Sequence, residues 1–326
     1  MSCSLHSRSI DTPGPLLLVH GGAWDIPDGE VQAHRDGLAE VLTAKPEAPE
    51  SNAEAVAGVT EAVAALERHG AFNAGYGAML NQEGAVELDA GVMAGDTLDY
   101  GAVMAVRHVR HPIRLAARLL RSETHRMRMV AAQGADRFAA DQGMDRVSND
   151  ELIHPRERRR FDRLRAQAET DHPSHSFLPE NVRPGGRDTV GAVMRDATGT
   201  LAAGTSTGGT PFKPPGRVGD APIPGAGFHA GAHVAVSTTG WGEAIAAVGL
   251  ARDVRERVRD GATAQEAACA SLQRMHTRIV SPDGEGATGG CIVVTPSDAA
   301  VAFTTPRMAR GWRTDTGDAH FSVHRE

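Results

Sequence analysis

Two groups of short apolar segments, one on each side of a long polar stretch, limit the fold of this chain more than any other feature. The candidate strands of the first group cover residues 16–19, 86–93 and 100–107, and those of the second cover 189–195, 200–205, 233–238, 291–295 and 299–303. Helical patterns accompany both groups, such as the apolar residues spaced three and four apart at Val56, Val59, Val63 and Leu66. The chain is therefore expected to combine sheets and helices.

The polar stretch between the two groups covers residues 141–186. It is dense in charge at residues 156–165, and Pro155, Pro173, Pro179 and Pro184 interrupt it. Because apolar periodicity is weak here, the stretch predicts a flexible linker whose arginines form a solvated surface.

Composition excludes several functional classes. The chain has 326 residues, enough for one large or two ordinary domains, and its net charge of −7 leaves no basic surplus for nucleic acid. No apolar run reaches the ~18 residues of a membrane helix, and the first residues lack a signal-peptide core, which points to the cytoplasm. Three widely spaced cysteines, Cys3, Cys269 and Cys291, support neither a disulfide framework nor a cysteine-rich zinc site.

Residues 204–208 match G-x-S-x-G, the pattern that places a nucleophilic serine in many esterases. Together with His20-Gly-Gly, which is similar to an oxyanion-hole motif, it gives a serine esterase that uses Ser206 as one alternative. Such a serine must be followed at once by a helix, whereas Pro211, Pro214 and Pro215 follow here. The context therefore argues against the esterase.

Thr189 offers a different nucleophile, at the head of a candidate strand directly after the linker. If the preceding peptide bond were cut, its α-amino group, with a reference pKa of ~7.7–8.0, would lie beside its own hydroxyl and act as its base. Downstream, Arg217 and Asp220 lie in a glycine-flanked turn and offer a guanidinium for a carboxylate and a carboxylate for an ammonium group. That pair suits a free amino-acid head group, with a plain surface salt bridge as the alternative.

These residues belong to a longer series of motifs: HGGAW (20–24), FNAGYGAML (72–80), ELDAGVM (87–93), DTVGAV (188–193), TSTGG (205–209), GRVGDAPIPGAG (216–227) and TTGWGE (238–243). In this order they make nearly the whole chain resemble the isoaspartyl peptidase and plant-type L-asparaginase family of N-terminal nucleophile hydrolases, which is related to glycosylasparaginase. The resemblance implies an α+β fold, a four-layer αββα sandwich, as one hydrolase domain over residues 1–326.

The same resemblance implies an inactive precursor that cleaves itself between Asp188 and Thr189. The products would be an α subunit of residues 1–188 and a β subunit of residues 189–326, paired into a dimer of heterodimers. The expected activity is hydrolysis of L-asparagine and β-aspartyl peptides through an aspartyl ester on Thr189, with small-molecule substrates and no nucleic-acid or membrane partner.

Site roles follow from the resemblance residue by residue. Thr189 would be the nucleophile, Thr207 would tune its hydroxyl, and Thr239 with the amide of Gly240 would form the oxyanion hole. The substrate would be bound by Arg217, Asp220, Gly240 and Gly242, and Asn73 would support the cleavage site. No catalytic cofactor is implied, but a structural sodium ion is, held by the backbone carbonyls of Leu66, Glu67, His69, Phe72, Ala74 and Tyr76.

Some positions depart from the family pattern and leave alternatives open. Arg187 stands where a histidine commonly precedes the Asp-Thr pair, and a fixed charge there would slow self-cleavage. In the extreme case the chain would be a processing-defective binding protein. Residues 210–213 resemble the glycosylasparaginase branch as much as the isoaspartyl peptidase branch. Glycosylated asparagine is therefore a further candidate substrate.

Overall fold

The structure, a computed structural model, describes residues 4–43, 54–122, 127–171 and 189–325, and the statements below refer to these ranges. The strands of a larger sheet are β2 (Leu16–Trp24), β3 (Leu88–Ala94), β4 (Tyr100–Val106), β5 (Met129–Ala131), β6 (Val190–Arg195), β7 (Leu201–Thr207), β12 (Arg307–Thr314) and β13 (Ala319–Ser322). Those of a smaller sheet are β1 (His6–Ile10), β8 (Phe228–Ala230), β9 (Ala235–Gly240), β10 (Gly289–Val294) and β11 (Ala299–Phe303).

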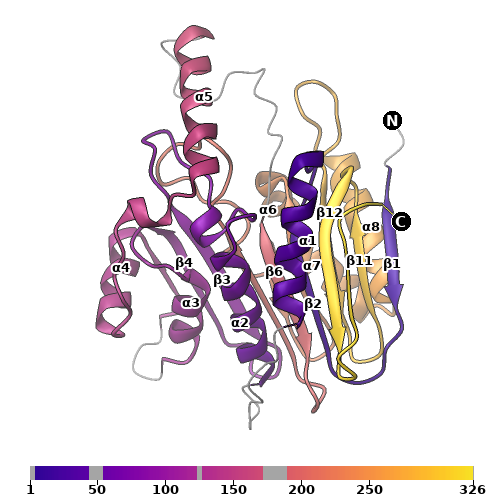
Figure 1. Ribbon diagram of the computed structural model, residues 1–326. Helices are drawn as coiled ribbons and strands as arrows, with labels where there is room; N and C mark the ends of the chain where they lie inside the picture. The colour runs from indigo at the N-terminus through magenta and orange to yellow at the C-terminus, as the bar shows by residue number, and fades with distance from the viewer. Residues whose placement is uncertain (1–3, 44–53, 123–126, 172–188, 326) are drawn as a thin grey trace.

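The strand order shows how distant parts of the chain share one sheet (Figure 1). The larger sheet has the order β13-β12-β2-β6-β7-β3-β4-β5 and the smaller one the order β1-β11-β10-β9-β8. Neighbouring strands are antiparallel except for the parallel pair β4 and β5. The predicted hairpin is confirmed, because β10 and β11 pair antiparallel.

The described chain also contains helices, most of which cover the outer faces of the sheets. They are α1 (Asp28–Thr43), α2 (Glu54–Arg68), α3 (Pro112–Leu120), α4 (Ala132–Asp141), α5 (Pro155–Asp171), α6 (Gly242–Val248), α7 (Leu250–Arg259) and α8 (Ala264–Arg278), with 3-10 turns at Gly75–Gly77 and Asn149–Leu152. The helices α1, α2 and α3 pack on the larger sheet, whereas α6, α7 and α8 pack on the smaller one (Figure 1). Mixed helices and two sheets are what the α+β class predicts.

Strand β2 shows why the sequence folds into layers. All nine of its residues are buried, and they alternate between two cores. Leu17 and Val19 face the core beneath α1 and α2, whereas Leu16 and Leu18 face the core shared with strands of the smaller sheet. A third core joins the smaller sheet to α7 and α8. A strand buried on both faces reads as a continuous apolar run, which is how residues 16–19 appear in the sequence.

The prediction of an aperiodic linker over residues 141–186 is wrong for residues 155–171, which form α5. Its first two turns are anchored by Glu157 and Phe161, which are buried, and Arg156 and Arg160 pair with Glu157 at 2.6 and 3.1 Å. Two buried positions on one face are enough to dock a helix but too few to produce a visible apolar period. Residues 172–186 lie outside the described ranges.

Within the described ranges, no helix has the length and apolar character needed to cross a bilayer.

Candidate active site

A small pocket brings together residues from strands and loops that are far apart in the sequence. It is lined by Thr189, Thr207, Gly209, Thr210, Arg217, Gly219, Asp220, Gly240 and Gly242. Of the residues that the sequence predicted for catalysis or substrate binding, only Thr239 does not line it. The structure therefore brings the other predicted catalytic and substrate-binding residues together at one site.

Thr189 lies immediately before β6, and its neighbour across the sheet is Thr207, at the end of β7. The register pairs Val190 with Ser206, which brings the two threonines level. The Thr189 hydroxyl donates a hydrogen bond to Thr207 Oγ1 at 3.2 Å, and Thr207 Oγ1 also accepts the N–H of Gly209 at 3.0 Å. Thr189 is 6% exposed, so its hydroxyl is held in place but stays within reach of the pocket.

Arg217 and Asp220 face the pocket from the loop after β7. The Arg217 guanidinium donates to Glu243 Oε1 through Nε at 3.0 Å and Nη2 at 2.6 Å. Asp220 is 5% exposed, and burial raises its pKa to about 7, because the hydrogen bond of its own backbone, the charge of Arg217 and the Thr238 hydroxyl offset the desolvation only in part. One cation and one titratable carboxyl therefore lie on the same side of the pocket.

Two glycines keep the space between this pair open. A Cβ on Gly242 would lie 2.8 Å from Asp220 Oδ1 and 3.0 Å from Arg217 Nη2, and one on Gly219 would lie 2.8 Å from Arg217 Nη1. Any side chain at these positions would displace the charged groups. The glycines therefore leave open the space beside the two charged groups, which a side chain would otherwise fill.

Gly240 lines the pocket at the end of β9, and Thr239 lies buried directly before it. Gly240 has a φ of +135°, and a Cβ there would lie 2.4 Å from Gly289 Cα, so this backbone is restricted to glycine. The Thr239 side chain is fully buried, and its oxygen accepts the N–H of Ala23 at 3.4 Å. The Thr239 hydroxyl hydrogen therefore remains able to donate.

Asn73 supports the pocket from behind rather than lining it. Its Nδ2 donates to Gly209 O at 2.6 Å, its Oδ1 accepts the N–H of Met79 at 2.8 Å, and its main-chain oxygen accepts the N–H of Gly208 at 3.0 Å. Asn73 thus fixes the residues that follow Thr207. Asp188 and Arg187 lie outside the described residues.

The loop predicted to hold sodium runs from the end of α2 to Tyr76. The carbonyls of Leu66, His69 and Ala74 each accept a backbone N–H at 3.1–3.3 Å, and each oxygen keeps a second lone pair for a cation. Carbonyl oxygens are ligands that hard cations accept. The donor set therefore fits a structural cation, although no group of His, Cys, Asp and Glu side chains in the described residues forms a metal site.

The geometry of Ser206 is unlike that of an esterase nucleophile. Ser206 is fully buried inside β7, and its hydroxyl donates to Glu67 Oε1 at 2.7 Å. No helix follows it directly, since the next element after β7 in the described chain is β8. His20 is buried within β2 and its Nε2 contacts Ser237 Oγ at 2.8 Å, not Ser206. The esterase alternative therefore lacks an exposed serine, and His20 does not act as its base.

Glu243, the partner of Arg217, is one residue of this site that sequence reasoning missed, as are Gly209, Thr210 and Gly219 in the pocket lining. Glu243 ends the TTGWGE motif and lies in the first turn of α6, 26 residues from the arginine it pairs with. A glutamate in a first helical turn is ordinary, so only the neighbouring motif could have drawn attention to it.

Known proteins are similar in sequence to this chain over most of its length. Residues 13–323 match the asparaginase family. The isoaspartyl peptidase/L-asparaginase of Xenopus laevis is 38% identical over 297 residues, which cover 90% of this chain and 91% of that protein. The isoaspartyl peptidase of Salmonella typhimurium is 40% identical over 306 residues, covering 91% of this chain and 94% of that protein. These matches confirm the resemblance carried by the motifs, and the chain belongs to the asparaginase family.

Proposed function

We propose that this protein is a self-cleaving threonine amidohydrolase that acts on L-asparagine and β-aspartyl peptides. The observation that carries the proposal is the Thr189 hydroxyl, bonded to Thr207 at 3.2 Å in a pocket that also holds Arg217 and Asp220. Relatives named isoaspartyl peptidase or L-asparaginase support the substrate class.

In the proposed reaction, Thr189 is the first residue of the mature β subunit and its neutral α-amine is the base. The amine takes the hydroxyl proton as Oγ1 attacks the side-chain carbonyl of the substrate. Donors from Gly240 N–H and the Thr239 hydroxyl stabilise the tetrahedral oxyanion, each for about 3 kcal/mol. The protonated amine then gives its proton to the leaving ammonia or amino acid, and water hydrolyses the aspartyl ester to release aspartate.

Substrate recognition is assigned to the aspartyl end that all these substrates share. Arg217 binds the α-carboxylate and Asp220 the α-ammonium group, while Gly240 and Gly242 leave room for the substrate backbone. Opposite charges about 3 Å apart give charge-assisted hydrogen bonds, which are roughly twice as strong as neutral ones. The leaving group lies beyond this end, so the glycosylasparaginase-like activity remains an alternative that no observation favours.

The larger assembly follows from the same proposal. The two sheets with their outer helices would form the four-layer αββα sandwich of N-terminal nucleophile hydrolases. Cleavage after Asp188 would give subunits of residues 1–188 and 189–326, paired into a dimer of heterodimers in the cytoplasm. Asn73, through its two bonds to Gly208 and Gly209, would hold the precursor site in register.

A structural sodium ion is part of the proposal, bound by the carbonyls of the loop from Leu66 to Tyr76. Its expected effect is on stability, because a cation bound only by the native loop stabilises the fold by mass action. The melting temperature should be higher in sodium chloride than in choline chloride of equal ionic strength. Equal melting temperatures in the two salts would contradict the sodium site.

The experiment that tests the function is a denaturing mass spectrum combined with an amidase assay. The wild type should give fragments of 188 and 138 residues and should release ammonia from asparagine. Thr189→Ala should remain one chain without amidase activity, because it lacks the attacking oxygen. Activity that survives in the uncut Thr189→Ala protein would refute the proposal. An uncut, inactive wild type that still binds aspartate would support the binding-protein alternative.

A further inference from the structure

The loop of residues 208–220, here called the substrate loop, carries Arg217 on a tight turn. Arg217 N donates to Pro214 O at 3.1 Å, and Gly216 before it has a φ of +80°. The backbone conformation of a turn sets the direction in which its side chains leave the main chain. The position of the Arg217 guanidinium therefore depends on what holds residues 213–216.

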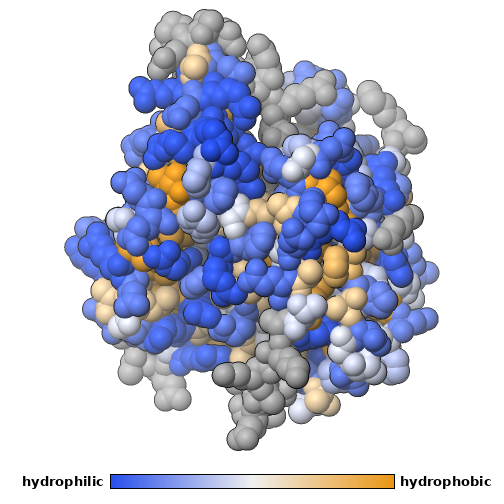
Figure 2. Space-filling model, in the orientation of Figure 1, coloured by the Kyte–Doolittle hydropathy of each residue, from blue (hydrophilic) through white to orange (hydrophobic). Residues whose placement is uncertain are grey.

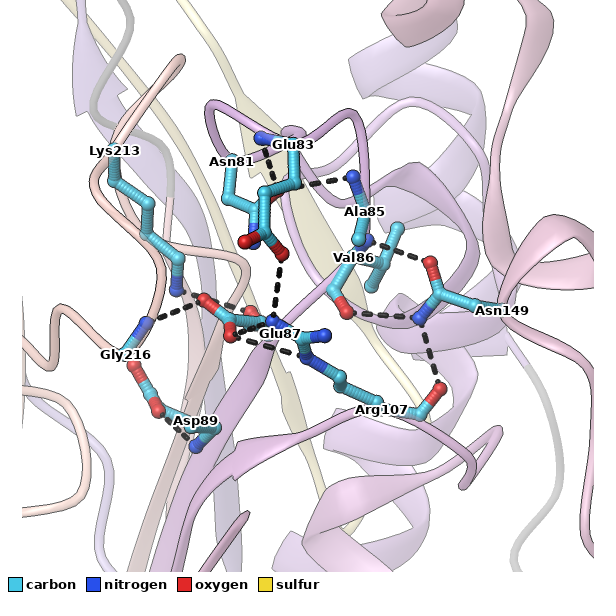
Figure 3. Close-up of polar contacts among 11 residues, drawn as sticks. Asn81, Glu83, Ala85, Val86, Glu87, Asp89, Arg107, Asn149, Lys213 and Gly216 are labelled. Carbon is cyan, nitrogen blue, oxygen red and sulfur yellow. Dashed lines mark hydrogen bonds and ion pairs between the residues drawn. The ribbon is translucent and has the colours of Figure 1, made fainter.

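Glu87 holds both ends of this turn (Figure 3). Its main-chain oxygen accepts Lys213 Nζ at 3.1 Å, and its Oε2 accepts the N–H of Gly216 at 2.9 Å. Glu87 is 2% exposed and Lys213 is fully buried, so water does not compete for either bond. Neither Glu87 nor Lys213 lines the pocket of Thr189.

Arg107 holds Glu87 from the opposite side. Its Nη2 and Nε donate to Glu87 Oε1 at 2.6 and 3.1 Å, which leaves Oε2 for Gly216 (Figure 3). Burial alone would raise the pKa of Glu87, but the bonds from Gly216 and Arg107 and the charge of Lys213 outweigh it and hold the pKa below its ordinary value. Glu87 is therefore a carboxylate at neutral pH, as both partners require.

We propose that Glu87 is a positioning residue for substrate recognition, which fixes the turn that aims Arg217 and is itself held by Arg107. The inference rests on the proposed function, because it takes Arg217 to be the group that binds the substrate carboxylate. Glu87 does not touch the reacting atoms. Its loss should weaken binding of the substrate and leave the acyl-transfer step nearly intact.

The surroundings of Arg107 make a second test possible. Glu87, Arg107 and Gly216 line another pocket, of about 710 Å³, whose lining does not include Thr189. The Arg107 side chain is 37% exposed there. A small cation from solution can therefore reach the place of its guanidinium.

The first test compares Glu87→Ala with Glu83→Gln. Glu83 is a matched control because it also pairs with Arg107, at 3.4 Å, but has no bond to the substrate loop. Glu87→Ala should raise KM for asparagine about tenfold, the effect of losing one charge-assisted hydrogen bond, with kcat within about twofold of the wild type. Glu83→Gln should match the wild type in both constants, and denaturing mass spectra should show equal cleavage.

The second test uses Arg107→Ala, which keeps the buried carboxylate. It should also raise KM, and millimolar guanidinium chloride should restore the KM while sodium chloride at equal concentration does not. If the wild type is active and KM is unchanged in both Glu87→Ala and Arg107→Ala, or if the variants lose only kcat, the positioning role of Glu87 is overturned. The proposed function would still stand in that case. A wild type that hydrolyses neither asparagine nor a β-aspartyl dipeptide would instead refute the proposed function.

Discussion

Burial gives Asp220 a charge state that changes near neutral pH, at the point where a substrate ammonium group is proposed to bind. Its pKa is raised to about 7 from an ordinary value of 3.8, chiefly by desolvation. Below pH 7 the free carboxyl is therefore mostly protonated and cannot pair with an ammonium group. Substrate binding must then supply the free energy of deprotonation.

This charge state predicts a pH-dependent affinity for the product L-aspartate. Its Kd should rise by up to about tenfold per pH unit as the pH falls below 7, because each bound ligand requires the release of one proton. Isothermal calorimetry between about pH 6 and about pH 8, roughly one unit on either side of the Asp220 pKa, measures it. Succinate, which has no ammonium group, is the control and should not lose affinity over this range. A flat aspartate profile would contradict the role of Asp220.

The pair between Arg217 and Glu243 leads to a second residue-level prediction. A substrate carboxylate competes with Glu243, whose side chain is 57% exposed, for Nε and Nη2 of the guanidinium. An exposed ion pair contributes about 0.2–1 kcal/mol, so Glu243→Gln should lower KM for asparagine by up to about fivefold. Steady-state kinetics give the answer, with Glu61→Gln, another exposed partner of an arginine far from the pocket, as control. A higher KM would mean that Glu243 orients Arg217 instead of competing for it.

The sequence predicted the residues that line the pocket better than those that hold it. The chemistry of Thr189, Arg217 and Asp220 can be read from the local sequence, whereas the role of Thr207 was implied by the family resemblance. Glu87 lies in a motif, ELDAGVM, but its partner Gly216 is 129 residues away and nothing in the sequence joins them. A buried carboxylate or a buried lysine is unfavourable without partners. Only the fold shows that Lys213 donates to the Glu87 main-chain oxygen and that Arg107 pairs with the Glu87 carboxylate.

Helix α5 is one element that sequence reasoning misjudged, and the strands β12 and β13 are among those it did not predict. The sequence of α5 is so rich in charged residues that it predicts a solvated segment. The surface of the projecting region around it is hydrophilic on the side shown in Figure 2. Its docking depends on few contacts, among them the ring of Phe161, 5.7 Å from the ring of Phe212 in the substrate loop. Phe212 has a φ of +58°, unusual for a bulky residue, so a neighbour must hold it there.

Removing that contact should loosen the helix. Phe161→Ala deletes a buried ring and should cost about 3 kcal/mol of unfolding free energy, measured by denaturant unfolding. Arg159→Ala, at an exposed position of the same helix, is the control and should stay within about 0.5 kcal/mol of the wild type. If the two variants unfold alike, α5 does not contribute to the stability of the core.

At the scale of the whole molecule, the larger sheet interleaves the two halves of the chain. β6 and β7, which follow residue 188, lie between β2 and β3, which precede it, and β12 closes on β2 from the other side. The sequence predicted most of these strands individually. It could not predict their order, because pairs such as β2 with β6 join segments more than 150 residues apart through contacts that leave no local pattern.

Interleaving predicts that the proposed cleavage does not separate the halves. The cut protein should elute from a size-exclusion column at the volume of uncut Thr189→Ala, because β6 remains paired with β2 and β7 and covered by α2. A denaturing gel of the same fractions should show two bands for the wild type and one for the variant. Separate elution of the two fragments without denaturant would contradict this arrangement.

The central place of β6 also bears on the order of events during synthesis. Thr189 is aligned only when β6 lies between β2 and β7, and its pocket is closed by β9, which comes about 50 residues later in the chain. Contacts between distant segments form late, since they carry the entropy of closing long loops. Under the proposed function, scission before Thr189 therefore acts as a checkpoint for folding: a chain that ends before β9 is expected to keep its peptide bond.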